Sequence, residues 1–396
     1  MSPYIKSLGY DIAIVASVGQ KYFRNYWNGI YVFPGTEEDN YAENVILYYL
    51  KEWYDRTGKP PILFQQTDMW SINEIPRFAQ QKQLLWVLYP ALDYDPIPND
   101  IINRMSGAFA IIPMCKWAEN TLRNTRIKEK ILPFVHHGVN EKIYHPLAES
   151  KEKIMENYPK TLKSLGFGKD SFNITIVAAN QIFRKPWDAF FQIVRKFRDN
   201  NPDIKVRLYC HTLMDVARGG WNLSELAKFF KLEDITIFSD PVSSVSGAYS
   251  EEDLSRIYNV SSVLLYTTYS EGFGLPVIES LACGTPVLTT DFTATGELVE
   301  PFPEFKVKVA GYFLVPRPLL VKAQPDIDDA VEKMTKIANS NLDDYLKICS
   351  EYAHKNFSWK HILPQWKDRL EKVEQLIDEQ CIEVPEAKKS AGVIKI

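Results

Sequence analysis

Short apolar runs alternate with amphipathic stretches along most of the chain. The apolar, β-rich runs predict strands, at residues 10–17, 29–33, 61–64, 84–89, 108–112, 131–135, 172–178, 205–210, 235–238, 262–266 and 287–290. Stretches with apolar positions at helical spacing predict helices, at residues 42–54, 116–122, 187–199, 223–230, 251–258, 276–283, 325–338 and 343–355. Such alternation predicts an α/β protein with parallel sheets covered by helices on both faces.

A polar, lysine-rich stretch at about 147–170 is the best candidate for a linker, since it ends in Gly166-Phe167-Gly168. This composition shift predicts an N-terminal domain at 1–168 and a C-terminal domain at 169–356. An amphipathic helix at about 357–380 then follows, and residues 383–396 are expected to form a mobile tail. Two similar domains facing across a cleft is the architecture that this pattern indicates.

Composition narrows the class of protein. The 396 residues are 45% hydrophobic, which supports full cores, and the net charge of −4 argues against a nucleic-acid partner. Five cysteines are scattered without a Cys-x-x-Cys pair, so neither a zinc site nor a disulfide framework is expected. We expect no signal peptide, since the first residues lack a basic start followed by an apolar core, and no run approaches the roughly 20 apolar residues of a membrane span. We expect a cytoplasmic protein, and peripheral contact with a membrane stays open.

Candidate chemistry is concentrated at residues 262–290. A strand leads into a loop with Gly272-Phe273-Gly274, a helix begins near Pro276, and Gly284 stands where a left-handed residue ends a helix. Backbone N–H groups at such a loop and helix start favour an anion. Glu271 and Glu279 flank that point and could accept hydrogen bonds from sugar hydroxyls.

This local pattern leaves two interpretations open. One is a site for a ligand that combines phosphates with hydroxyls. The other is an ordinary strand–helix turn whose carboxylates respond to the helix dipole. A dinucleotide fingerprint is excluded, because Val277 occupies the place of the third small residue.

The stretch YSEGFGLPVIESLACGTPVLTT resembles the Glu-x7-Glu motif of the retaining GT-B glycosyltransferases of family 4. Three further segments resemble that family in the same order: PFVHHGVNEKIYHP at 133–146, VAANQIFRKPWD up to Asp188, and Phe357-Ser358-Trp359. The resemblance covers most of residues 84–375 and is strongest at 172–299. It implies a GT-B fold with two Rossmann-like domains, and a sugar-transfer activity.

The resemblance also implies residue roles. Glu271 would bind hydroxyls of the donor sugar, and Glu279 would bind the ribose hydroxyls of the nucleotide. Arg184 and Lys185 would neutralise the diphosphate. Backbone contacts to the sugar and distal phosphate would come from Gly272, Phe273, Gly274 and Leu275. The base would stack near Asp240, Pro241 and Val242.

Two departures from the family pattern stand out. We expect the family's first strand and its Gly-rich loop to be missing from this sequence, since Tyr4–Leu8 resembles the end of the helix that follows them. Two explanations stay open: the start of the sequence is assigned too far downstream, or the protein lacks this element. The family's His in the N-terminal domain is also absent. Asp93 is the nearest polar candidate for its catalytic place and Asp68 the other, while His136 and His137 are expected to be structural.

Asp93-Tyr94-Asp95 spells the D-x-D of metal-dependent GT-A enzymes, but the two-domain pattern and the Glu pair favour GT-B. We therefore expect no metal and no cofactor beyond a nucleoside diphosphate sugar as donor. The acceptor would be a hydroxyl on a glycan, lipid or protein-linked sugar. The alternatives are a non-catalytic nucleotide-sugar-binding protein and a GT-B phosphorylase or epimerase.

Overall fold

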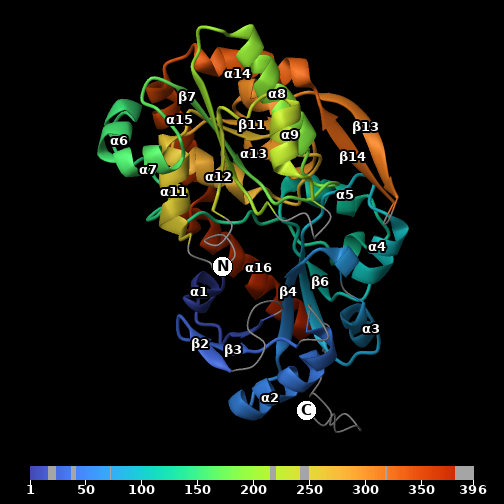
Figure 1. Ribbon diagram of the computed structural model, residues 1–396. Coiled ribbons are helices and arrows are strands. Elements are labelled where there is room, and N and C mark those ends of the chain that lie inside the picture. The colour runs from blue at the N-terminus through green and yellow to red at the C-terminus, as the bar shows by residue number, and fades with distance from the viewer. Residues whose placement is uncertain are drawn as a thin grey trace. The chain divides into compact units, whose positions relative to one another are not determined.

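The computed structural model describes residues 1–16, 24–36, 42–71, 73–214, 220–240, 249–316 and 319–379 (Figure 1). The chain forms two compact units. The first comprises Met1–Leu92, Pro96–His137 and Ile362–Ile396, and the second comprises Asp93–Asp95 and Gly138–His361. The predicted base contacts at Pro241 and Val242 and the predicted tail at 383–396 lie outside the described residues.

The first unit contains two small sheets and their flanking helices. Its elements are α1 (Ser2–Lys6), β1 (Ala13–Val15), β2 (Asn25–Trp27), β3 (Ile30–Phe33), α2 (Ile46–Thr57), β4 (Ile62–Thr67), α3 (Glu74–Gln80), β5 (Leu85–Pro90), α4 (Asn99–Met105), β6 (Ala110–Ile111), α5 (Lys116–Arg123) and most of α16 (Trp359–Glu379). One sheet has the order β1-β3-β2 and the other β4-β5-β6.

Strand β2 runs antiparallel to β3, which the alternating pattern does not predict. The cause is the two-residue turn Asn28-Gly29, where both residues have positive φ (49° and 69°). Asn-Gly favours this left-handed turn, whose twist matches that of two antiparallel strands. The pairs β1–β3, β4–β5 and β5–β6 are parallel, as expected.

Aromatic packing ties α16 into the first unit. The Trp366 ring on α16 makes edge contacts with Tyr89 on β5 and Phe64 on β4, at centroid distances of 4.8 and 5.5 Å. Arg369 on the same helix donates to the carbonyl oxygen of Pro133 at 2.9 Å. The predicted amphipathic helix is therefore present, and its apolar side covers the β4-β5-β6 sheet.

The second unit is a larger α/β layer structure. Its elements are α6 (Lys151–Asn157), α7 (Pro159–Ser164), β7 (Phe172–Val177), α8 (Trp187–Asn200), β8 (Val206–His211), α9 (Leu223–Phe229), β9 (Thr236–Phe238), α11 (Glu251–Val260), β10 (Val263–Tyr266), α12 (Leu275–Ala282), β11 (Val287–Thr290), α13 (Thr293–Leu298), β12 (Lys306–Val307), β13 (Val309–Pro316), β14 (Leu319–Pro325), α14 (Ile327–Ala338) and α15 (Leu342–Phe357).

Six strands of this unit form one parallel sheet in the order β12-β11-β10-β7-β8-β9. Counted from β7, this is the Rossmann order 3-2-1-4-5-6. The central strands are buried on both faces, which explains their continuous apolar runs. Helices α8, α9 and α14 pack together, as do α11, α12 and α15, on the two faces of the sheet (Figure 1). The order reverses between β7 and β10, so ligands are expected at the carboxyl ends of these two strands.

The lysine-rich stretch at 147–170 is not a linker, because it forms α6 and α7 within the second unit. Ser150 caps α6 by accepting the N–H of Lys153. Ile154 and Leu162 pack into a core cluster with Ile257 on α11. Lys151 is buried, whereas Lys153, Lys160 and Lys163 lie on the exposed sides of the two helices. A count of lysines does not show this division into a buried and an exposed side.

The strand predicted at 131–135 is absent. Ile131 makes one isolated parallel bridge to Ile111. The N–H of Leu132 donates to the Ile111 carbonyl oxygen at 2.9 Å, and that of Val135 donates to the carbonyl oxygen of Pro113, beyond the end of β6, at 3.0 Å. Prolines at 113 and 133 limit further ladder pairing, since proline has no N–H to donate.

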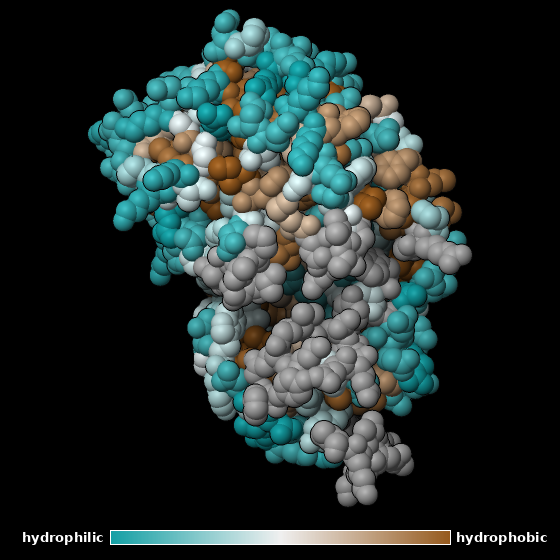
Figure 2. Space-filling view, viewed as in Figure 1, coloured by the Kyte–Doolittle hydropathy of each residue, from teal (hydrophilic) through white to brown (hydrophobic). Residues whose placement is uncertain are grey.

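The hairpin β13–β14 was missed from the sequence. Its strands pair antiparallel from Gly311↔Gln324 to Pro316↔Leu319. The outer face exposes apolar side chains, with Tyr312, Leu314 and Leu319 all more than 60% exposed. Figure 2 shows hydrophobic side chains gathered over the part of the molecule where Figure 1 places this hairpin.

Candidate functional site

The loop after β10 is rigidly built. Gly274 caps α12 with φ +104°, a conformation that L side chains rarely adopt, and a Cβ there would lie 2.9 Å from the Thr295 methyl. The Thr293 hydroxyl accepts the N–H of Glu271 and donates to its carbonyl oxygen, both at 3.0 Å. These contacts hold the Glu271 backbone in one place at the carboxyl end of the strand.

A second loop, after β7, lies against the first. The N–H of Tyr269 donates to the carbonyl oxygen of Arg184 at 3.4 Å. Lys185 forms an ion pair with Glu271, donates to the Tyr266 hydroxyl at 2.9 Å and stands 4.6 Å over the Tyr266 ring. Burial lowers the pKa of Lys185, and the Glu271 charge opposes that shift.

Charges of opposite sign alternate through this site. Arg184 stands between two carboxylates, with Nε 4.0 Å from Asp93 Oδ2 and a terminal nitrogen 4.0 Å from Glu271 Oε2. Lys185 is on the far side of Glu271, and Lys322 is 2.7 Å from Asp93 Oδ2. We call the five residues Lys322, Asp93, Arg184, Glu271 and Lys185 the charge cluster.

The three cations of the charge cluster differ in exposure. The side chains of Lys185 and Lys322 are 7% and 2% exposed, whereas that of Arg184 is 33% exposed. Arg184 is therefore the cation that an incoming anion can reach. Because it stands near the ends of both β7 and β10, where the strand order reverses, the arrangement is suited to an anionic group beside hydroxyls.

Glu279 is partly exposed, whereas Glu271 is buried. It is one turn into α12 and accepts a hydrogen bond from the Tyr258 hydroxyl at 2.9 Å. Burial raises the pKa of Glu279 to about 7, despite the hydrogen bonds from Tyr258 and Tyr144. Its carboxyl group therefore changes charge near neutral pH. The predicted ribose contact stays a prediction.

The structure brings four sequence-predicted residues together in the charge cluster: Glu271, Arg184, Lys185 and Asp93. Gly272, Phe273, Gly274 and Leu275 form the adjoining loop and helix start, where Phe273 is buried and Leu275 is 38% exposed. Asp240 is the second residue after β9 and is exposed, and its role stays a prediction.

Other candidates lie elsewhere. Asp68, His136 and His137 belong to the first unit, and the His136 ring packs on Phe134 at 4.9 Å. Asp95 is exposed, whereas Asp93 is buried against Lys322, so the two carboxylates of the D-x-D spelling have different surroundings. Among the described residues, no group of three or more His, Cys, Asp or Glu side chains is placed to hold a metal ion.

Sequence reasoning missed Lys322, Thr293 and Tyr266. Lys322 carried a signal, because it is the one charged residue in the apolar run Leu319–Pro325. Thr293 carried none, since a left-handed threonine (φ 52°) contradicts its usual preference. Tyr266 ended a predicted strand, and only its contact with Lys185 reveals a role.

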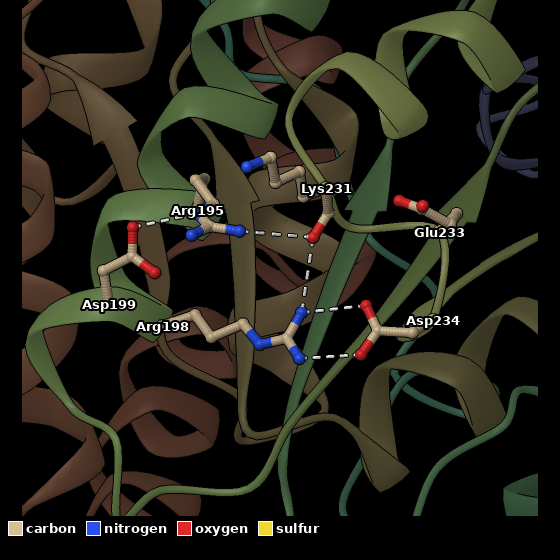
Figure 3. A pocket seen from close by; sticks show the side chains of 6 residues that line it. All are labelled: Arg195, Arg198, Asp199, Lys231, Glu233 and Asp234. Carbon is tan, nitrogen blue, oxygen red and sulfur yellow. Dashed lines mark hydrogen bonds and ion pairs between the residues drawn. The ribbon is translucent and has the colours of Figure 1, made fainter.

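A surface pocket in the second unit is unrelated to this site (Figure 3). Its charged side chains largely pair with one another. Arg198 donates two hydrogen bonds to the Asp234 carboxylate, at 2.8 and 2.7 Å, and Arg195 donates one to Asp199 at 2.8 Å. The pocket lies beside the residues that precede β9, at the amino ends of the strands. Ligands of this sheet type bind at the opposite ends.

Residues 168–356 match the model of the family described as glycosyl transferases group 1. The uncharacterized glycosyltransferase 335 of Sulfolobus islandicus rod-shaped virus 1 is 25% identical over 217 residues, which cover 53% of this chain and 55% of that relative. The D-inositol 3-phosphate glycosyltransferase of Thermobifida fusca (strain YX) is 27% identical over 133 residues, which cover 33% of this chain and 29% of that relative. The chain thus spans about half or less of the length of these curated relatives.

Solved structures match over nearly the whole chain. The sucrose-phosphate synthase of Thermosynechococcus elongatus has a TM-score of 0.69 at 14% identity, over 94% of this chain and 91% of that chain. Anabaena Alr3699/HepE in complex with UDP and glucose has a TM-score of 0.64 at 12% identity, over 87% of each chain. The predicted GT-B fold is confirmed. Within the described ranges, no helix is both long and apolar enough to span a membrane.

Proposed function

We propose that this chain, which has the GT-B fold and carries a glycosyl transferases group 1 domain at residues 168–356, is a retaining glycosyltransferase. It would transfer a sugar from a nucleoside diphosphate sugar to a hydroxyl acceptor. The proposal rests on one observation: the partly exposed Arg184 stands within 4.0 Å of two buried carboxylates at the carboxyl ends of β7 and β10. The cation suits the diphosphate, and the carboxylates suit the hydroxyls of a sugar.

In this proposal Arg184 meets the diphosphate and Glu271 accepts hydrogen bonds from the donor sugar. An ionised carboxylate has about four acceptor positions, so Glu271 has capacity beyond its bonds to neighbouring side chains. Lys185 holds the Glu271 carboxylate in place. As the bond between the anomeric carbon and the phosphate oxygen breaks, negative charge grows on the diphosphate. A fixed cation there typically lowers the activation free energy by a few kcal/mol.

Retention of configuration is proposed from the resemblance to family 4. The acceptor oxygen would attack the anomeric carbon on the same face from which the diphosphate departs. An oxygen of the departing phosphate would take the acceptor proton. Asp93 is the proposed polar partner from the loop after β5, in the place of the family's His. We propose that no metal is required, because the resemblance is to the GT-B enzymes and Arg184 would provide positive charge near the diphosphate.

The alternative is a nucleotide-sugar-binding protein of the same fold that does not catalyse transfer. The segment Tyr89–Asp93, which contains no His, favours it. Because the solved Anabaena structure holds UDP and glucose, UDP sugars are the first donors to compare.

The experiment incubates the purified chain with UDP, GDP and ADP sugars, with and without hydroxyl acceptors, and measures nucleoside diphosphate release and product mass. NMR of the product reports the anomeric configuration, and a parallel reaction contains a chelator. Arg184→Ala is expected to lose about 100-fold or more in turnover. Arg198→Ala removes an arginine of the pocket in Figure 3 and is the matched control, with turnover unchanged.

The outcomes separate the two readings of the site. Release or transfer with retained configuration supports the proposal. Binding of a nucleotide sugar by calorimetry without turnover supports the alternative, and the absence of both binding and turnover for all donors refutes both.

A further inference from the structure

Lys322 is a buried lysine that reaches the site from the hairpin β13–β14. Its side chain is 2% exposed, and its ammonium group donates to Asp93 Oδ2 at 2.7 Å, to the Asp93 carbonyl oxygen at 3.1 Å and to the Ser270 hydroxyl at 2.5 Å. An ammonium group has three protons, so these partners use its full donor capacity. Lys322 therefore acts on other protein groups and not on a ligand.

The hairpin is anchored to the same loop that carries Glu271. The Phe313 ring packs edge-on against the Tyr269 ring at a centroid distance of 4.8 Å, and the N–H of Ala323 donates to the Tyr269 carbonyl oxygen at 3.1 Å. Tyr269 and Ser270 directly precede Glu271. The position of Lys322 is thus fixed relative to the charge cluster by the backbone as well as by its own side chain.

Asp93 has two cations near it, and they are not equivalent. Lys322 makes direct contact at 2.7 Å, whereas Arg184 stays 4.0 Å away. Without Lys322, Asp93 would be a buried carboxylate whose nearest cation is Arg184, and a buried charge without a partner is strongly unfavourable. Arg184 would then move onto Asp93 and become less available to the ligand.

We propose that Lys322 is a positioning residue that neutralises Asp93 and so keeps Arg184 available to the diphosphate of a nucleotide ligand. This inference rests on the proposed function, because it assumes that Arg184 meets a diphosphate. It assigns the hairpin β13–β14, which carries Lys322, a role in the site. It also gives Asp93 a defined partner on an element 229 residues away in sequence.

The test measures UDP binding by isothermal titration calorimetry for the full chain and four variants. Lys322→Met is expected to weaken UDP affinity at least 10-fold. Lys322→Arg, which retains the positive charge, is expected to recover most of it. Asp93→Asn combined with Lys322→Met is expected to recover UDP affinity to within about 3-fold of the original chain, because no carboxylate remains to capture Arg184.

Lys151→Met is the matched control. Lys151 is the other fully satisfied buried lysine of this unit, with bonds to Asn259 and Ser261 carbonyl oxygens and to the Thr285 hydroxyl at 3.0, 3.1 and 2.7 Å. Asn259 and Ser261 lie at the end of α11, and Thr285 lies just before β11. These partners are therefore at the amino ends of β10 and β11, and the charge cluster is at the carboxyl ends. Its replacement is expected to lower the melting temperature while leaving UDP affinity within 2-fold.

Recovery in the double variant is a result that a purely structural lysine would not produce. The inference is overturned if Lys322→Met binds UDP as the original chain does, or if the double variant binds as weakly as Lys322→Met. If the original chain binds neither UDP nor another nucleoside diphosphate, it is the proposed function that fails, and the two failures are therefore distinguishable.

Discussion

Lys185 and Glu271 form an ion pair in which both side chains are less than a tenth exposed. The pair joins the loop after β7 to the loop after β10, across the point where the strand order reverses. Tyr266 lies beneath it, with its hydroxyl 2.9 Å from the Lys185 ammonium. Two loops that each place one charge at a strand end are thereby held together as one site.

Replacing Lys185 with Met should be strongly destabilising. Glu271 would remain buried, with Arg184 at 4.0 Å as its closest remaining cation. Breaking a buried pair from one side typically costs about 3–5 kcal/mol of unfolding free energy. Urea unfolding measures this loss, and Lys185→Met with Glu271→Leu should be more stable than Lys185→Met alone because no charge is left unpaired.

Lys196→Met serves as the control for this prediction. Lys196 forms an exposed ion pair with Asp328, and such pairs contribute within about 1 kcal/mol. If Lys185→Met loses no more unfolding free energy than Lys196→Met does, the buried pair does not have the stabilising role predicted for it.

Glu279 should make stability depend on pH. Its pKa is raised from 4.5 to about 7 by burial, so between these values the folded chain binds a proton that the unfolded chain has released. Stability from this group is fully present below pH 4.5 and is lost as pH rises through about 7, by roughly 3 kcal/mol in total. Urea unfolding at several pH values measures the slope.

Glu279→Gln keeps an acceptor for the Tyr258 hydroxyl and cannot ionise. The variant is expected to have a flatter profile of stability between pH 4.5 and 7. Equal slopes for the two proteins would exclude Glu279 as the source. If the carboxylate also binds ribose hydroxyls, UDP affinity of the original chain should rise through the same pH range and that of the variant should not.

The loop after β10 could be predicted from the sequence because its residues lie close together in the chain. Strand, glycine loop, Pro276 and Gly284 occur in one short segment, and Gly284 has the left-handed conformation (φ 76°) that its position indicates. The parallel sheet of the second unit was predictable for the same reason, since alternating apolar runs specify strands and helices one at a time.

The parts that were missed depend on contacts between distant segments. No residue near Lys322 in the sequence indicates that its ammonium group contacts Asp93. The hydrogen bond between the Thr293 hydroxyl and the Glu271 N–H likewise joins two separate loops. The helices at 151–164 were hidden by their lysines, although Ile154 on α6 and Leu162 on α7 pack into one core cluster.

Gly274→Ala should lower the unfolding free energy more than a glycine-to-alanine replacement at an open left-handed position does. A side chain at φ +104° is strained, and its Cβ would lie 2.9 Å from the Thr295 methyl. We expect a loss of more than about 2 kcal/mol in unfolding free energy and weaker UDP binding, because the loop must shift. Gly58→Ala is the control, since Gly58 has φ +67° and no atom within 4 Å of a Cβ.

Gly58→Ala should lose only about 1 kcal/mol and leave UDP affinity unchanged. Urea unfolding and calorimetry on both variants make the comparison. Similar losses of stability in both variants, with UDP affinity intact in Gly274→Ala, would contradict the role given to the tight loop.

Thr293 combines strain with a useful contact. Its φ of 52° costs about 1–2 kcal/mol for a residue with a side chain, yet its hydroxyl bonds to both the N–H and the carbonyl oxygen of Glu271. Thr293→Ala loses the contact and keeps the strain, whereas Thr293→Gly loses the contact and removes the strain. We therefore expect Thr293→Gly to be the more stable of the two by about 1 kcal/mol.

Binding should rank the same variants differently. Both Thr293→Ala and Thr293→Gly free the Glu271 backbone. Under the proposed function, both should therefore bind UDP sugars more weakly and transfer more slowly, while Thr293→Ser retains the hydroxyl and should stay close to the original chain. Urea unfolding and calorimetry on the three proteins separate strain from contact. If Thr293→Gly binds a UDP sugar as tightly as Thr293→Ser, the hydroxyl is not what holds Glu271 in place, and the left-handed turn itself must set the loop.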